Sequence, residues 1–174
     1  NIPGGVILSN FPDVKKLQKC FNTLVQRHES LRTYFELENE NVIQKIKPSL
    51  AFKLEIAEED IEMKNIKSAF KEFVRPFDLS KAPLIRAKLV PIRLSNRVLL
   101  LVDMHHIISD GSSLTILVNE LCKLYNDEVL PDLQITYKDF ACFENEQLHN
   151  GSFKDAEEFW VNQFKNDKKK KKNA

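Results

Sequence analysis

The sequence has few of the residues that build common ligand-binding motifs. Only four of its 174 residues are glycine and only three are cysteine. The glycines form no glycine-rich phosphate loop, and the histidines, cysteines and aspartates do not have the spacing of a metal site. The cysteines are odd in number and far apart in the chain. They therefore indicate reduced core thiols in a cytoplasmic protein, and not a disulfide framework.

Long apolar runs and a large net charge are also missing. No stretch of 18 apolar residues occurs, so no membrane span is expected, and no segment resembles a signal peptide. The formal net charge of +1 gives no strong field that would attract nucleic acid or a membrane. Much of the positive charge comes from Lys168–Lys172. We interpret residues 166–174 as a solvated, disordered tail, so neither nucleic acid nor membrane is an expected partner.

What the chain does contain is enough apolar residues for a core. Hydrophobic residues make up 43% of it, and the length fits one domain or one lobe of a larger protein. Apolar spacing predicts helices at 13–28, 60–74, 112–125, 137–148 and 153–164, with Pro12 or Asp13 opening the first and Asp60 capping the second. Apolar alternation or runs predict strands at 6–8, 31–37, 42–46, 52–56, 85–89 and 98–102. The period changes from helical spacing to two at Leu31, and a polar turn over Glu38–Asn41 would join the second and third of these strands into a hairpin. This mixture indicates an α/β sandwich with a mixed, largely antiparallel sheet.

One of these strands carries charged residues at alternate positions. Ile85, Ala87 and Leu89 alternate with Arg86 and Lys88. Strict alternation of apolar and polar residues is typical of a strand with one buried and one solvated face. Arg86 is therefore expected on a half-exposed surface.

The most informative segment is Met104–Gly111, with the sequence MHHIISDG. It follows Val98–Val102, a run typical of a strand buried on both faces, and precedes a helix that Ser112 or Ser113 could cap. The end of a buried strand is where α/β enzymes place chemistry, and an imidazole that titrates near neutral pH suits proton transfer. A histidine in isolation would be explained more simply as a buried residue whose nitrogens bond backbone groups.

Three segments, in this order, resemble the condensation domains of nonribosomal peptide synthetases. They are Arg27–Phe35 (RHESLRTYF), Met104–Gly111 and Tyr137–Ala141 (YKDFA), and the stretch Phe77–Arg86 adds to the likeness. The resemblance covers nearly all of this chain but under half of the family's domain. It implies a chloramphenicol acetyltransferase-like fold, a two-layer α/β sandwich. Residues 1–165 would form the N-terminal lobe of a two-lobed domain.

The resemblance also implies a reaction, in which a carrier-bound amine attacks a carrier-bound thioester and forms an amide. His106 would take the proton of the ammonium group or orient the amine, and the sequence leaves both roles open. His105 would mainly brace the loop, with a direct chemical role as the alternative. Gly111 would let a phosphopantetheine arm pass close to the backbone. The alternative is a glycine that merely begins the following helix.

Asp110 resembles the family's structural carboxylate, which pairs with an arginine behind the loop and so holds His106 in place. Arg32 is the first candidate for that arginine and Arg27 the second, and the alternative is that both are solvated. No metal or directly bound cofactor is expected, because the substrates would arrive on the phosphopantetheine arms of carrier domains.

The expected partners are donor and acceptor carrier domains, the C-terminal lobe of the same domain and a neighbouring adenylation domain. One lobe cannot enclose a tunnel that two lobes form, so this chain alone is expected to be inactive, with an apolar face exposed. Two other functions remain open. One is an ester-forming, carrier-dependent acyltransferase of the same fold, and the other is a docking module without catalysis, against which the intact histidine motif argues.

Overall fold

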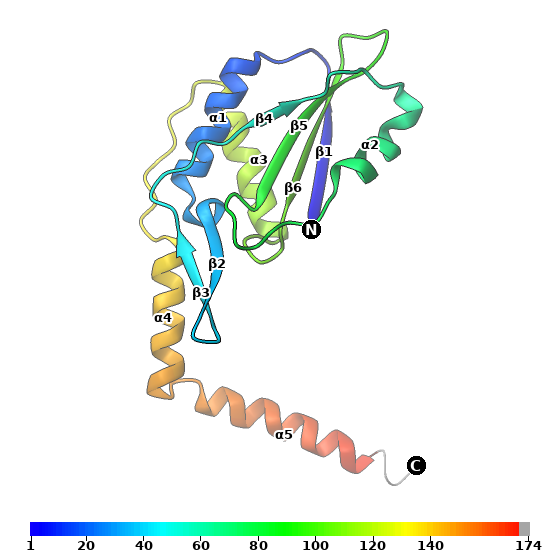
Figure 1. Ribbon diagram of the computed structural model, residues 1–174. Helices are drawn as coiled ribbons and strands as arrows, with labels where there is room; N and C mark the ends of the chain where they lie inside the picture. Colours follow the sequence, from blue (N-terminus) through cyan, green and yellow to red (C-terminus); the bar gives the residue numbers. More distant parts are fainter. Residues whose placement is uncertain (171–174) are drawn as a thin grey trace. The chain divides into compact units, whose positions relative to one another are not determined.

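The computed structural model describes residues 1–170, and the contacts divide the chain into two compact units (Figure 1). The first unit is Asn1–Leu133, and the second begins at Gln134. The first unit holds the sheet, the hairpin and three α-helices, whereas the second holds two further helices.

A four-stranded sheet in the order β1-β6-β5-β4 forms the centre of the first unit. Its strands are β1 (Ile2–Leu8), β4 (Leu54–Ile56), β5 (Ile85–Pro91) and β6 (Val98–Met104). Strand β6 is antiparallel to both of its neighbours, whereas β4 and β5 run parallel. The mixed, mostly antiparallel sheet predicted from the sequence is confirmed.

The predicted hairpin is a separate two-stranded sheet of β2 (Thr33–Glu38) and β3 (Asn41–Ile46). Its turn residues Asn39 and Glu40 have φ values of 49° and 67°. Positive φ at both central residues matches the right-handed twist of the two strands. The turn therefore lies within the polar segment Glu38–Asn41, as the sequence predicted.

Helices cover both faces of the central sheet. They are α1 (Val14–Arg27), α2 (Ile66–Phe73) and α3 (Gly111–Tyr125). Successive side chains of β6 point to opposite faces, so Leu100 and Met104 join the core with α1 and α3, whereas Leu99 and Leu101 pack with α2. The predicted α/β sandwich is confirmed, and the short helix α2 adds cover on the second face.

The first helix begins as predicted and the second does not. The Asp13 carboxylate caps α1 by accepting the Lys16 backbone N–H at 3.0 Å. Asp60 caps no helix and instead accepts from Nε of Arg93 at 2.8 Å. The backbone N–H of Ile61 bonds to the carbonyl of Pro91 at 2.9 Å, so this segment extends the sheet edge. Helix α2 therefore begins only at Ile66, after the 3₁₀ helix η2 (Met63–Asn65).

The expected exposure of strand β5 is wrong at one position. Arg86 is buried, with 8% of its surface exposed. Strand β5 lies between β4 and β6 in the sheet order, and a helix packs on each face of the sheet. An alternating pattern shows which residues share a face of the strand. It does not show whether another element covers the polar face, and here one does.

The cysteines differ from one another in their environment. Cys20 is buried as predicted, and burial raises the pKa of its thiol. Cys122 and Cys142 are exposed, so the prediction of core thiols is wrong for these two. All three are free thiols. Within residues 1–170, no helix is both long and apolar enough to span a membrane.

The second unit contains α4 (Tyr137–Asn150) and α5 (Lys154–Lys170). Gly151 ends α4 with a φ of 77°, a left-handed conformation that glycine adopts without steric cost. Helix α5 includes residues 166–170 of the tail that the sequence led us to expect as disordered. Residues 171–174 of that tail lie outside the described residues.

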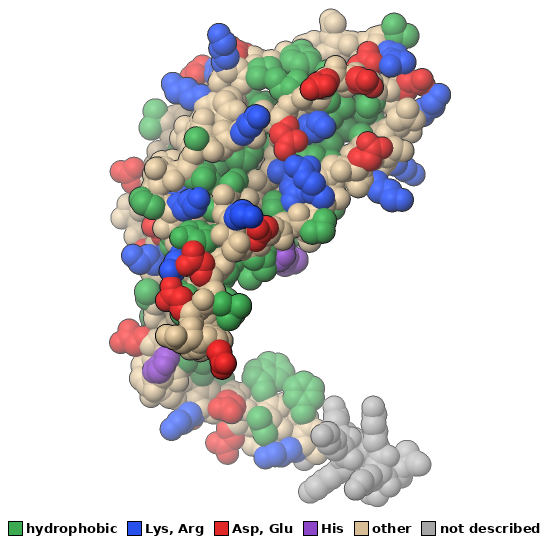
Figure 2. Space-filling view, in the orientation of Figure 1, with side chains coloured by type: hydrophobic (Ala, Val, Ile, Leu, Met, Phe, Trp, Pro, Cys, Tyr) green, Lys and Arg blue, Asp and Glu red, His purple; other side chains and the backbone are tan. Residues whose placement is uncertain are grey.

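Large apolar side chains are exposed on both helices of the second unit. They include Tyr137, Phe140, Phe143, Phe159, Trp160 and Phe164. Figure 2 shows a group of these green side chains on α5. No side chain described for this unit is buried, so within the described residues the unit has no core of its own.

Candidate active site

The histidine motif forms the loop between β6 and α3, and His105 folds this loop. Its backbone N–H donates to the Leu84 carbonyl at 3.0 Å, which continues the sheet for one more residue. Its own carbonyl accepts the Ile108 backbone N–H at 3.1 Å and the Ser109 hydroxyl at 3.0 Å. The loop is therefore closed into a turn directly after the strand.

The ring of His105 also takes part in the turn. Its Nδ1 accepts the backbone N–H of Ile107 at 3.0 Å. A neutral imidazole whose Nδ1 accepts a hydrogen bond carries its proton on Nε2. This bond therefore assigns the Nε2–H tautomer to His105 in its neutral form.

His106 is exposed at the tip of this turn, whereas Ile108 and Ser109 are buried beneath it. Ile108 belongs to the main core and so anchors the loop from below. The imidazole of His106 is consequently held on the solvent side of a fixed turn. A ligand approaching the end of β6 can reach it without opening the core.

Asp110 is the N-cap of α3. Its carboxylate accepts the Ser113 backbone N–H and the Ser113 hydroxyl, each at 2.7 Å, and its own N–H donates back to the Ser113 oxygen at 3.2 Å. These hydrogen bonds lower the pKa of Asp110. The expectation that Ser112 or Ser113 caps this helix is wrong, because the carboxylate occupies the N-cap and Ser113 completes a reciprocal capping box.

The pKa of Asp110 predicts a dependence of stability on pH. A carboxyl whose folded pKa lies below its ordinary 3.8 stabilises the fold above that value, and the contribution is lost as pH falls through the lowered pKa. Asp110→Asn keeps a good cap but cannot titrate. We expect the difference in thermal midpoint between wild type and this variant to be largest at pH 5–7 and to shrink toward pH 3. Asp132→Asn, in a segment without helix, is the matched control, and a difference constant over the whole range would contradict the prediction.

Arg32 does not pair with Asp110, so our first candidate for the bracing arginine is wrong. Its buried guanidinium donates to the carbonyls of Val25 at 3.1 Å and Gln26 at 3.2 Å, at the end of α1. It also donates to the carbonyls of residues 47–48, after β3. The last carbonyls of a helix lack partners and attract cations. Arg32 therefore ties the end of α1 to the hairpin, because four of its five N–H donors are engaged by these carbonyls.

Arg27, our second candidate, pairs with a different carboxylate. Its Nε lies 3.2 Å from Oε1 of Glu120, and Nε2 of His28 lies 2.6 Å from the other oxygen. This mostly buried cluster joins the end of α1 to α3. Neither arginine is solvated as the alternative expectation had it, and among residues 1–170 no arginine is recorded in an ion pair with Asp110.

A buried polar cluster below the loop was missed by the sequence analysis. Asp103, the residue before Met104, is fully buried, and its Oδ2 accepts from Nδ2 of Asn1 at 2.8 Å. Nε of Arg86 lies 3.7 Å from the same oxygen. The sequence did mark Asp103, because a carboxylate directly after five apolar residues is unusual. It did not identify Arg86 as the partner, because only the β5–β6 register places Arg86 opposite Asp103.

Burial affects the two charges of this cluster in opposite directions. It raises the pKa of Asp103 and lowers the pKa of Arg86, since each loses hydration that the other restores only in part. Among the described residues, no group of three or more side chains is arranged to hold a metal ion.

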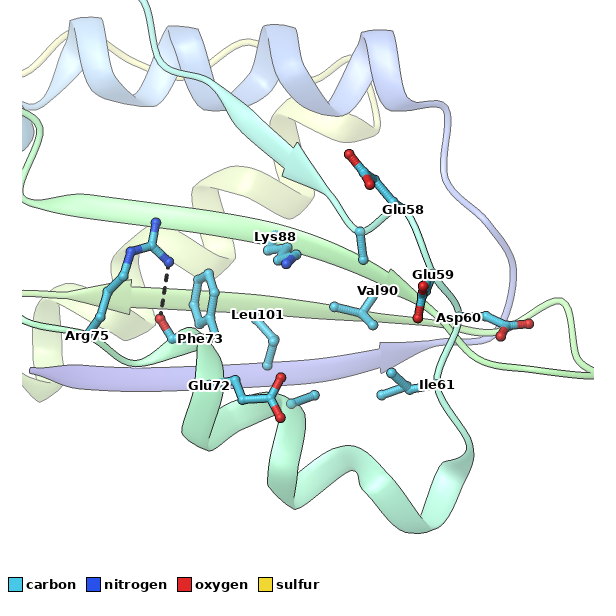
Figure 3. Close-up of a pocket in the computed structure, with 12 residues that line it drawn as sticks. Glu58, Glu59, Asp60, Ile61, Glu72, Phe73, Arg75, Lys88, Val90 and Leu101 are labelled. Carbon is cyan, nitrogen blue, oxygen red and sulfur yellow. Dashed lines mark hydrogen bonds between the residues drawn. The ribbon is translucent and has the colours of Figure 1, made fainter.

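Two cavities of the first unit lie away from the loop. One, of about 280 Å³, lies on the α2 side of the sheet, with Glu58, Glu59, Asp60 and Glu72 around an apolar floor (Figure 3). The other, of about 620 Å³, is apolar and lies between the β1–β6 edge and helices α1 and α3. Neither is lined by His105 or His106. In this lobe, therefore, neither cavity encloses the histidine loop.

Comparison with known proteins adds sequence relatives. The family described as the Condensation domain matches residues 2–172. Gramicidin S synthase 2 of Aneurinibacillus migulanus is 42% identical over 164 residues, which cover 94% of this chain and 4% of that protein. Surfactin synthase subunit 1 of Bacillus subtilis (strain 168) is 43% identical over 164 residues, with the same coverage of 94% and 4%. The chain thus spans a small part of the length of these relatives.

Solved structures show the same fold. The condensation domain of the Monacolin K polyketide synthase MokA aligns with a TM-score of 0.78 at 20% identity, over 91% of this chain and 36% of that one. The X-domain in its complex with OxyB from teicoplanin biosynthesis aligns with a TM-score of 0.77 at 22% identity, over 87% and 34%. The predicted fold class is confirmed, and this chain spans about a third of each of these structures.

Proposed function

This chain belongs to the condensation-domain family of nonribosomal peptide synthetases, and from that membership we propose that it is the N-terminal lobe of an amide-forming domain. An acceptor amine attacks the carbonyl carbon of a donor thioester, the C–N bond forms, and the C–S bond breaks to release the donor thiol. The observation that carries the proposal is the exposed His106, held at the end of β6 by a turn that His105 closes.

His106 has two roles available in this reaction. As a general base it removes a proton from the amine, and the departing thiolate is protonated in turn, so that charge and protons balance. As a positioning group it accepts a hydrogen bond from the amine and aligns the lone pair with the thioester carbon. Its position on the solvent side of the turn supports either role, because an incoming amine can reach it.

The rest of the domain supplies what this lobe lacks. A second, C-terminal lobe closes over the loop and covers exposed apolar side chains, and carrier domains deliver both substrates on phosphopantetheine arms. An adenylation domain in the same synthetase loads the acceptor carrier. The chain spans about a third of the structures that it resembles, which supports this division of labour.

The test uses the complete two-lobed domain with loaded donor and acceptor carriers, and identifies the product by mass spectrometry. An amide product supports the proposal, and an ester formed only with hydroxyl acceptors identifies the ester-forming alternative. Carrier binding without any product indicates a docking module. The 174-residue chain alone is assayed beside it. We expect no turnover from it, and turnover would contradict the need for a second lobe.

Gly111 offers a separate test of where the phosphopantetheine arm passes. A Cβ added there meets nothing within 4 Å, and no positive φ requires glycine. Alanine is the better helix former, so Gly111→Ala should leave the thermal midpoint unchanged or slightly raised. If the arm passes over this backbone, the methyl displaces it, and we expect kcat/KM to fall about ten- to a hundredfold.

The neighbouring exposed residue Ser112 provides the control for this substitution. Ser112→Ala adds no bulk at the same helix end and should keep wild-type kinetics. Unchanged kinetics in Gly111→Ala would instead mean that this glycine merely begins α3.

A further inference from the structure

We propose that Arg86 is a positioning residue for the histidine loop, which it holds by stacking on Phe77 and, through Phe77, on the ring of His105. The expected effect on kcat rests on the proposed function. The expected effect on the orientation of the His105 ring does not. Strand β5 supplies Arg86, the segment after α2 supplies Phe77, and the end of β6 supplies His105. The three groups meet below the loop that presents His106.

The first step of the argument is that Arg86 is buried with few hydrogen bonds. Its Nη2 donates to the Pro76 carbonyl at 3.3 Å, and its Nε lies 3.7 Å from the Asp103 carboxylate, beyond hydrogen-bond distance. Among the described residues, its Nη1 and Oδ1 of Asp103 are buried without a hydrogen-bond partner. A buried charge pair with unmade hydrogen bonds destabilises a fold relative to an apolar pair of similar size. Stability alone therefore does not explain this pair.

The second step is the stack that the guanidinium makes. Its Cζ lies 3.6 Å from the centroid of the Phe77 ring, close enough for a strong cation–π contact in a buried place. The same guanidinium is held by the ion pair with Asp103 and by the hydrogen bond to the Pro76 carbonyl. Phe77, which is half-buried and follows Pro76 in the chain, thus packs against a buried guanidinium whose position is set by these two contacts.

The third step connects Phe77 to the motif. The rings of Phe77 and His105 meet edge to face, with centroids 6.2 Å apart and planes at 82°, a favoured arrangement of aromatic pairs. Among the described residues, the His105 ring has one hydrogen bond, which its Nδ1 accepts from the Ile107 N–H at 3.0 Å. The contact with Phe77 therefore sets the rotation of the His105 ring that keeps Nδ1 on that N–H.

The consequence concerns His106, which lies between the two bonded residues His105 and Ile107. If the His105 ring turns, the Ile107 N–H loses its acceptor and the backbone on both sides of His106 relaxes. A shift of about 1 Å in a positioning group can lower a rate by about a hundredfold. Arg86 would thus act on kcat through the loop without touching a substrate.

Two pairs of substitutions distinguish the effect of the stacking contact from the effects of charge and of side-chain volume. Arg86→Lys keeps the charge but removes the planar face, and Phe77→Leu keeps apolar volume but removes the ring. Phe77→Tyr keeps the ring and should rescue every effect of Phe77→Leu. Arg93→Lys is the matched arginine control, because Arg93 lies beyond the opposite end of β5 and pairs with Asp60 on the surface.

The experiment measures ring ¹⁵N shifts of histidine in the complete two-lobed domain, with His105→Gln to assign the signal, and kcat and KM for loaded carriers on the same samples. We expect one tautomer of His105 with an unprotonated Nδ1 in wild type, Phe77→Tyr and Arg93→Lys. In Arg86→Lys and Phe77→Leu we expect a mixture of tautomers. In both variants kcat should fall about ten- to a hundredfold, with KM nearly unchanged.

The outcomes separate this inference from the proposed function. If folded Arg86→Lys and Phe77→Leu show the same His105 ring ¹⁵N chemical shifts as wild type, the stack does not hold the ring, and the inference is refuted whatever the activity. Mixed tautomers in these variants of a domain that makes no amide product would support the stack and refute the proposed function. If Arg86→Lys does not fold, the comparison of Phe77→Leu with Phe77→Tyr decides the question by itself.

Discussion

Replacing His106 by alanine in the complete domain is expected to lower kcat for amide formation by about 10²–10⁴-fold, the usual contribution of a positioned proton-transfer group. The fold should be unaffected, because the side chain is exposed and surface substitutions away from caps and cores change stability by less than about 0.5 kcal/mol. The measurement pairs single-turnover product formation with a thermal melt.

His105→Ala is the informative comparison for this variant. It removes the acceptor of the Ile107 N–H and the ring that meets Phe77, so it should lower both the rate and the melting temperature. A pH–rate profile then separates the two roles of His106. If His106 is a general base, the rate decreases as the pH falls through the pKa of the imidazole. If His106 only aligns the amine, the rate follows the protonation of the amine alone. Equal turnover by His106→Ala and wild type would remove His106 from the mechanism and favour a docking module or another base.

Phe21→Ala is expected to have the largest effect on stability, a loss of about 3–5 kcal/mol in the free energy of unfolding. Phe21 lies on α1, is fully buried and stacks on Phe52 with centroids 5.0 Å apart. It also lines the largely apolar cavity of about 620 Å³, so its removal enlarges a space that already exists beside α1. Little stability is recovered by collapse at such a site.

Urea unfolding of wild type and variant measures this loss as a lower midpoint at unchanged slope. Phe11→Ala is the matched control, because the same side chain is 47% exposed there and should cost less than about 0.5 kcal/mol. A loss below about 1 kcal/mol in Phe21→Ala would show that α1 does not pack on the sheet as described. Together, the two variants distinguish catalysis from stability. His106→Ala should lower kcat without changing the free energy of unfolding, and Phe21→Ala should mainly lower the free energy of unfolding.

Local patterns in the sequence predicted most of the elements correctly. Helical spacing on α1 and α3, the apolar run of β6 and the change of period at the hairpin each describe a short stretch of chain, and each element lies where its pattern placed it. Such patterns succeed because helices and half-buried sheets repeat their burial every 3.6 or every two residues. The location of the histidine motif directly after a buried strand followed from the same reasoning.

The charged partners could not be predicted in this way. Arg32 and Arg27 were both placed near Asp110 by the resemblance, yet one binds carbonyls at the end of α1 and the other binds Glu120 of α3. Arg86 was placed on a half-exposed face, yet it is buried against Asp103. A charged side chain pairs with whatever the fold brings within a few ångströms, and sequence spacing does not encode that distance.

The sequence by itself thus determined the kind of lobe, its strands and helices, and the segment that carries the histidines. Only the tertiary structure decided which distant groups support that segment: the Leu84 carbonyl that anchors His105, and a stack of Arg86 on Phe77 beneath the His105 ring. The physical reason is that periodic burial is a local property of the chain. The pairing of polar groups, in contrast, depends on strand order and helix packing, which join residues far apart in the sequence.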